Sequence, residues 1–316
     1  MSDTPLFMHD DFWPAVEKGQ FLRPRWEQIA AVIDDTRDGP DRAAAWHEAR
    51  DRWIGHAIKT LNASRTPTPM NLPYCLGCSE HFRIIAPYKQ DTADDVASLG
   101  EKFRVIARQI LGEAITSDPF VGHVVLIIDD RKVAQQYLDY FGVNAGAISG
   151  LCIHAPFPHI MMHNFTRFHL RLVFVHELNH AVLHKLPIPT WIHEGLSRHF
   201  ESRLLTIANM RFANEVDVGR NRLWREIGIA DFWNGSVFYD TRASTAYLLA
   251  TKMITRLLKR DAALFTQFML KANRRDAGDA ACREIYGHPI LDLARELLGP
   301  GDWEAPKIRE DKVTAT

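Results

Sequence analysis

The chain has 316 residues, of which 46% are hydrophobic and 24% charged, and its formal net charge is −1. These values are ordinary for a globular protein, and the length allows two modest domains or one large domain with an extension. The balanced charge gives no reason to expect nucleic acid or an anionic membrane as a partner, and no apolar run approaches the ~18 residues of a transmembrane helix. The first 20 residues are acidic and lack the pattern of a secretory signal, so the expected location is the cytoplasm.

Two amphipathic helices are predicted near the N-terminus. Apolar residues at helical spacing mark the first over 26–33 and the second over 42–61, and Gly39 and Pro40 separate them. We expect both helices to pack as a cap on the following domain rather than to bind a partner. The segment 62–73 contains three prolines and no periodicity, which is typical of a linker.

The four cysteines do not predict a metal site or a disulfide. Cys75 and Cys78 form a C-x-x-C pair, whereas Cys152 and Cys282 stand alone, and the chain has no second C-x-x-C. A redox motif would need a helix directly after the first cysteine, but Gly77 lies inside the pair and a strand-like run follows. We therefore expect reduced thiols in a turn.

Strands and helices alternate from residue 82 onward. The spacing of apolar residues predicts strands at 82–86, 123–128, 148–154 and 159–163, and helices at 91–111 and 131–141. For this part of the chain we expect an α+β fold.

The run 168–185 contains the most informative motif, His176-Glu177-Leu178-Asn179-His180. Its apolar residues outnumber those of a surface helix, which predicts a helix buried on most sides. On a helix, His176 and His180 lie one turn apart on the same face, where two imidazoles can share a divalent metal. The Glu177 carboxylate would then hold and deprotonate a metal-bound water.

A catalytic zinc site needs a third protein ligand and leaves the fourth position to water. Glu194 is the candidate. Pro187 and Pro189 end the first helix, and Thr190 is a plausible N-cap of a second helix over 191–205. A short reversal between the two helices would bring the Glu194 carboxylate to a metal held by the first.

The paired motifs HELNH and WIHEGLSRHFE resemble the gluzincin clan of zinc metallopeptidases, in particular its bacterial peptidase MA-like group. The resemblance implies a zincin-like domain with a small mixed sheet, an active-site helix and a helical C-terminal half. The predicted domains are an N-terminal helical extension with its linker over 1–73, the catalytic domain over 74–300, and a frayed tail over 301–316.

The resemblance also implies how the site works. It assigns one zinc ion per chain to His176, His180 and Glu194, and it makes Glu177 the general base in the hydrolysis of a peptide or protein substrate. In this clan the last strand before the metal helix, here 160–163, is a sheet edge that can pair with an extended peptide.

The group that stabilises the oxyanion is less clearly marked. The position at which this family often has a tyrosine is Ala243 here. Tyr239 and Tyr247, one turn to either side, are the candidates, and His163 is a third. The aromatic segment 232–239 is predicted either to line a substrate pocket or to pack helices together.

Competing interpretations can be compared on the same residues. A metzincin would need glycine and histidine where the chain has Leu183 and Leu186, so that class is rejected. His184 continues the helix face, but it would lie roughly 12 Å from His176, too far to share one ion. Two other functions stay open, namely a zinc-binding module without turnover and an interaction protein in which HELNH is accidental. The sequence leaves the oligomeric state open.

Overall fold

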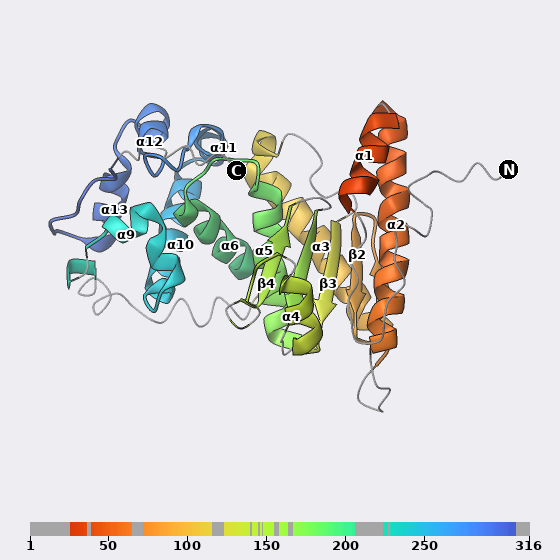
Figure 1. The fold of residues 1–316 in the computed structure, drawn as a ribbon. Coiled ribbons are helices and arrows are strands. Elements are labelled where there is room, and N and C mark those ends of the chain that lie inside the picture. The colour runs from red at the N-terminus through yellow and green to blue at the C-terminus, as the bar shows by residue number, and fades with distance from the viewer. Residues whose placement is uncertain are drawn as a thin grey trace. The chain divides into compact units, whose positions relative to one another are not determined.

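Figure 1 shows the fold in a computed structural model of the chain. The chain divides into two compact units, one made of residues 1–101 and 120–177 and the other of residues 102–119 and 178–316. Two of the three boundaries between the units fall inside helices, namely α3 (Gln90–Leu111) and α5 (Arg167–Leu183). The structure describes residues 26–36, 39–64, 72–115, 123–139, 141–144, 146, 148–154, 158–163, 167–205, 224–226 and 228–307.

The first unit is built on a five-stranded mixed sheet in the order β1-β2-β3-β5-β4. The three inner strands run parallel, whereas β1 and β4 are antiparallel to their neighbours. Every residue of β3 is buried, as expected of a central strand that is covered on both faces. The strands are β1 (Cys75–Cys78), β2 (Phe82–Ala86), β3 (His123–Ile128), β4 (Gly150–Ile153) and β5 (His159–His163).

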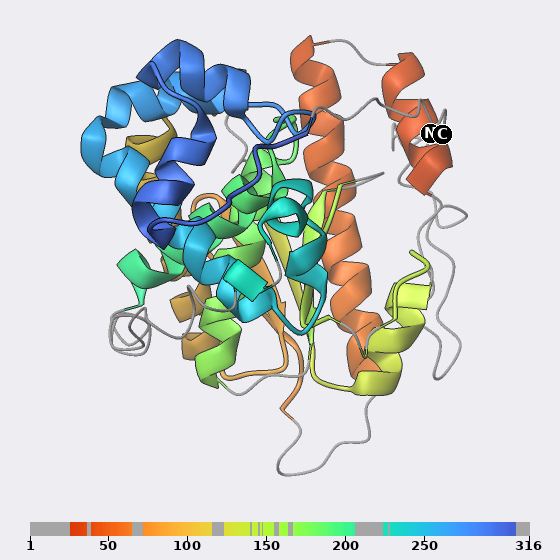
Figure 2. The ribbon, with the colours of Figure 1, turned by 90° about the vertical axis from the view of Figure 1, so that its left-hand side faces the viewer.

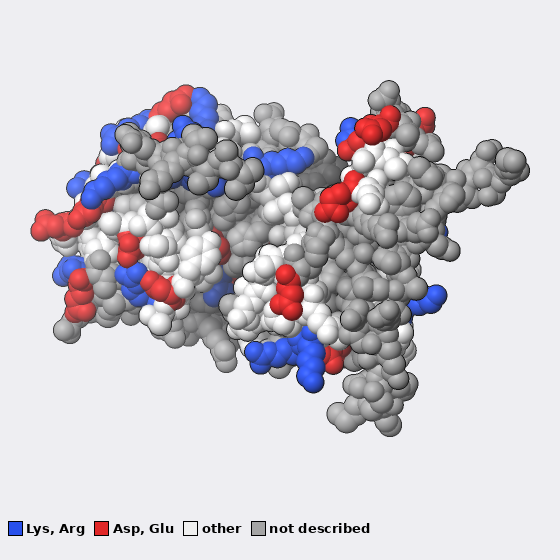
Figure 3. All heavy atoms as spheres, in the orientation of Figure 1, with Lys and Arg blue, Asp and Glu red and all other residues white. Residues whose placement is uncertain are grey.

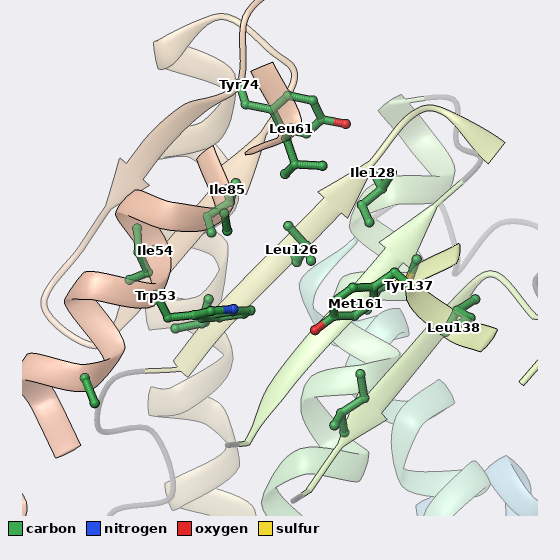
Figure 4. Close-up of a cluster of buried hydrophobic side chains, with 14 of the residues drawn as sticks. Trp53, Ile54, Leu61, Tyr74, Ile85, Leu126, Ile128, Tyr137, Leu138 and Met161 are labelled. Carbon is green, nitrogen blue, oxygen red and sulfur yellow. The ribbon is translucent and has the colours of Figure 1, made fainter. Parts of the chain in front are cut away.

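One face of the sheet is covered by α1 (Trp26–Thr36), α2 (Gly39–Ser64) and α4 (Arg131–Asp139). Figure 4 shows this core, in which Leu126 from the sheet and Trp53 from α2 are buried in the same cluster. Burial of each such side chain stabilises the fold by about 1.5–3 kcal/mol. The prediction that the N-terminal helices pack on the following domain is confirmed.

The opposite face of the sheet carries α5 and the first part of α3. The Phe82 ring of β2 lies edge-on to Phe174 of α5, with ring centroids 6.2 Å apart. A Cβ built on Gly100 of α3 would stand 2.7 Å from the Phe82 ring. Both helices therefore pack on this face of the sheet against the Phe82 ring.

Helix α2 is longer at both ends than predicted. Gly39 and Pro40 begin the helix instead of separating two helices, and proline is tolerated there because its missing N–H has no helical acceptor in the first turn. At its other end α2 extends into the predicted linker. The Asn62 side chain there accepts a hydrogen bond from the Tyr74 N–H (2.7 Å) and donates one to the Tyr74 carbonyl (3.3 Å). Residues 65–71 lie outside the described part of the chain.

The strands at 82–86, 123–128 and 159–163 are confirmed, but two predictions about the sheet are wrong. Cys75 and Cys78 lie in β1 rather than in a turn, because this segment pairs with β2 along its whole length. Neither cysteine is in a disulfide, and the Cys75 thiol donates a hydrogen bond to the Tyr88 carbonyl at 3.2 Å. The strand before the metal helix, β5, is not an edge, since β4 pairs with it on its outer side.

The second unit is helical in its described part after residue 178. Figure 2 shows the C-terminal helices in blue gathered beside α10. Residues 206–223 and 227 lie outside the described part of the chain. The elements are α6 (Thr190–Leu204), α9 (Ala230–Asn234), η4 (Ser236–Tyr239), α10 (Ala243–Arg260), α11 (Ala262–Lys271), α12 (Asp279–Tyr286) and α13 (Ile290–Leu298), with the short η3 (Gly112–Ala114) after α3.

The C-terminal segment is not frayed over residues 301–307. Trp303 is only 5% exposed, and its indole N–H donates to the Gly299 carbonyl at 2.7 Å. The Trp233 indole N–H donates to the Glu304 carbonyl at 2.9 Å. These bonds dock the segment on α9, and the rest of the predicted tail, 308–316, lies outside the described residues.

Candidate metal centre

Helix α5 confirms the helix predicted around the HELNH motif. Phe174, Val175 and Leu178 are fully buried, so the apolar side chains of the helix determine which way its polar residues point. His176 and His180 are half-buried and lie one turn apart on the same face.

Asn179 ties α5 to the helix that follows it. Its side chain is fully buried, and its amide nitrogen donates to the His193 carbonyl and to Ser197 Oγ, each at 2.9 Å. Ser197 Oγ in turn donates to the same His193 carbonyl at 3.1 Å. Because Asn179 precedes His180 and His193 precedes Glu194, this network sets the position of two ligand residues at once.

Helix α6 begins at Thr190, and Pro189 rather than Thr190 is its N-cap. The prediction of a capping threonine is therefore wrong. The Pro189 carbonyl accepts the N–H groups of Ile192 (3.0 Å) and His193 (3.3 Å). Thr190 instead packs against Gly235, where a Cβ would stand 2.6 Å from Thr190 Oγ1.

Glu194 is held in the first turns of α6 by the packing of α6 on α10. A Cβ on the adjacent Gly195 would stand 2.7 Å from the Ala250 carbonyl oxygen and from the Ile254 side chain. Only glycine allows this approach, which explains the glycine of the WIHEG segment. Glu194 itself is 6% exposed.

The three predicted ligand residues come together. One potential ligand atom each of His176, His180 and Glu194 lies within 4.8 Å of the other two, and His180 Nε2 is 3.6 Å from Glu194 Oε1. In a tetrahedral zinc site with bonds near 2.1 Å, neighbouring ligand atoms are about 3.4 Å apart. This group could therefore hold a metal ion.

The neighbouring histidines are placed differently. His184 is exposed, and its Nδ1 lies 2.7 Å from the Ala181 carbonyl of its own helix, so it is not part of the metal group. The His193 ring is tilted against that of His180, with centroids 5.6 Å apart. His163, considered for the oxyanion, is only 2% exposed on the inner strand β5.

Glu177 lies against the edge strand β4. Its side chain is 9% exposed, and a Cβ on Gly150 would stand 2.7 Å from Glu177 Cγ. Burial and then the negative charge of Glu177 raise the pKa of the Cys152 thiol on the same strand. Cys152 therefore stays protonated and is a poor nucleophile.

The two candidate tyrosines both lie within electrostatic reach of Glu194. Tyr239 is 82% exposed, and partial desolvation followed by the charge of Glu194 raises its pKa. Burial and then Glu194 also raise the pKa of Tyr247, whose ring lies 5.0 Å from the Arg198 guanidinium carbon. Both hydroxyls therefore remain protonated donors. Ala243 begins α10 between them and offers no such group.

The aromatic segment 232–239 mainly packs helices together. Phe232, Trp233 and Phe238 are buried, and their rings contact one another at centroid distances of 5.2 and 5.7 Å. Tyr239, at its end, is the exception.

Sequence patterns missed Asn179, although a buried amide in an apolar helix is a signal that could have found it.

Comparisons with known proteins assign no family. A scan against models of protein families finds no match, and a search of the curated proteins finds no similar sequence. Among the described helices, none is both long and apolar enough to cross a bilayer.

Proposed function

We propose that the chain is a zinc-dependent metallopeptidase. The observation that carries this proposal is the convergence of His176, His180 and Glu194, with Glu177 next to the first ligand on the same helix. The donor set of two imidazoles and one carboxylate suits zinc and leaves a fourth position open, as catalytic zinc sites require.

Glu177 is the proposed general base. Zinc, when bound, acts as a Lewis acid toward water and toward the substrate carbonyl. Glu177 accepts the proton of the attacking water and passes it to the leaving amine. Its contact with Gly150 limits where the carboxylate can move, which suits a group that must take and return one proton.

A tyrosine is the proposed oxyanion donor. Tyr239 is the better candidate, because its exposed side chain can reach a substrate and its raised pKa keeps the hydroxyl protonated. Tyr247 on α10 is the second candidate, and the Arg198 guanidinium lies over its ring.

The edge strand β4 is the proposed place for an extended peptide. Among the described strands, β4 pairs only with β5. Its first residue, Gly150, adjoins Glu177, so a peptide that pairs with β4 would pass the general base.

Figure 3 shows basic and acidic side chains interspersed on the drawn face, which does not resemble a surface for nucleic acid.

Metal analysis tests this function most directly. Protein purified without a metal-affinity tag should contain about one zinc per chain, and His180→Ala and Glu194→Ala should lose it. Glu177→Gln should keep the zinc but cleave a peptide library about 10²- to 10⁴-fold more slowly, because an amide accepts no proton. Wild-type protein without zinc, or zinc unaffected by Glu194→Ala, would contradict the proposal.

A zinc-binding module without turnover is the second candidate. The observation that favours it is Ala243, which stands where a tyrosine is expected by resemblance. In that case Glu177→Gln would change neither zinc content nor any activity. Absence of metal from all preparations would instead favour an interaction protein in which the motif is accidental.

A further inference from the structure

The second unit contains a cavity of about 260 Å³ that is separate from the metal group. It is formed by α9, the turn after α11 and the C-terminal segment near residue 304. The side chains that define its chemistry are Trp233, Asn234, Arg274, Arg275, Glu304 and Lys307.

The charge of this cavity differs from that of the chain. Arg274, Arg275 and Lys307 line it together with a single acid, Glu304, whereas the whole chain has 38 basic and 39 acidic residues. An arginine guanidinium offers planar donors that pair with both oxygens of a carboxylate or phosphate.

Hydrogen bonds within the protein hold the walls of the cavity. The Arg274 N–H donates to the Pro187 carbonyl at 2.8 Å, and the Trp233 indole N–H donates to the Glu304 carbonyl at 2.9 Å. The Ala277 carbonyl accepts the Trp191 indole N–H at 3.0 Å. Ala277 has φ +55°, a strained conformation for alanine that persists only where the surroundings fix it. The cavity is therefore preformed.

We propose that this cavity binds a small organic anion, a carboxylate or a phosphate monoester. The anionic group pairs with Arg274 and Lys307, and the carbon skeleton lies against Trp233. The volume lies near the lower end of the range of about 300–1,000 Å³ that small-molecule pockets have, so the cavity suits a small molecule rather than a peptide. The negative charge of Glu304 repels a second anionic group, so ligands that place one on this side of the cavity bind less well.

Isothermal titration of the full-length, metal-loaded protein tests the proposal. The probes are inorganic phosphate, glycerol 3-phosphate and the monocarboxylate butyrate, which separate phosphate from carboxylate recognition. Arg274→Gln should weaken binding of the preferred probe about tenfold or more. Its backbone bond to Pro187 is unaffected, and circular dichroism verifies the fold.

Lys259→Gln is the matched control. It removes one positive charge from an exposed position on α10 outside the cavity, and it should leave affinity unchanged. In wild-type protein, a bound probe should also slow tryptic cleavage after Arg275 and Lys307. Equal weakening by both variants would reveal non-specific charge attraction, and no binding of any probe would overturn the proposal. Neither result depends on catalysis at the metal group.

Discussion

Gly150 of β4 and Glu177 of α5 approach so closely that no side chain fits between them. A Cβ on Gly150 would stand 2.7 Å from Glu177 Cγ and 2.8 Å from Val173 Cγ1. Real Cβ atoms do not come this near to other carbons, so an added methyl group must displace the glutamate or the strand. The edge strand and the proposed general base are therefore positioned together.

Gly150→Ala should impair the proposed general base, Glu177, without loss of zinc. We expect zinc content to stay near the wild-type value and kcat to fall about 10²-fold, because a displacement of about 1 Å misplaces the proton acceptor. Peptide cleavage and metal analysis on the same preparation measure both. Gly55→Ala is the control, since nothing lies within 4 Å of that position on α2. A Gly150→Ala protein with wild-type kcat would show that the contact does not position Glu177.

Asn179→Asp should weaken metal binding without removing a ligand. The substitution keeps the size of the side chain but loses the amide donor to the His193 carbonyl and to Ser197. Groups that hydrogen-bond a metal ligand typically contribute 10- to 100-fold in affinity, and because Asn179 bonds the residue next to a ligand we expect about tenfold. Competition with a zinc chelator measures the change. Asn144→Asp, at an exposed position, should leave zinc affinity unchanged, and an equal effect at both sites would contradict the positioning role.

Tyr239→Phe and Tyr247→Phe should differ in their effect on kcat. Loss of an oxyanion donor typically costs about 10²- to 10³-fold, and we expect this for Tyr239, whose side chain is 82% exposed. Tyr247→Phe should have a smaller effect, because the Tyr247 ring already packs against Phe238 and Arg198. Both variants should keep zinc. The reverse order of effects would make Tyr247 the donor.

The sequence predicted the elements whose pattern is local. The spacing of apolar residues found α5 and α6, and the offset between His176 and His180 found the metal group because one helix turn fixes it. The place of Glu194 was also predictable, since two prolines force a short reversal between the helices.

Contacts between distant segments could not be found in this way. No spacing rule connects Gly150 to Glu177, which lie 27 residues apart, or Gly195 to α10. The outer position of β4 depends on the pairing of β4 with β5, and strand order is not encoded by periodicity. The docking of residues 301–307 depends on two tryptophans whose partners are backbone carbonyls, and any sequence could supply those.

His199 predicts how stability changes with pH. Burial on α6, and then the charge of Arg203, lower the pKa of this imidazole to about 4. Between that value and an ordinary pKa near 6.5, the unfolded chain binds a proton that the folded chain does not. Stability contributed by neutral His199 is therefore complete above pH 6.5 and is lost as the pH falls toward 4, by up to about 1.4 kcal/mol per pH unit.

His199→Gln should remove this part of the slope. Glutamine has no proton to gain and can still bond Thr255, whose Oγ1 lies 3.5 Å from His199 Nδ1. Urea unfolding of metal-free protein at several pH values between 7.5 and 4.5 measures the free energy of unfolding. Metal-free protein is used so that zinc occupancy does not differ between samples. Asn144→Gln, at an exposed position and without a titratable group, serves as the control and should retain the wild-type slope. Parallel curves for His199→Gln and wild type would mean that His199 titrates alike in the folded and unfolded chains.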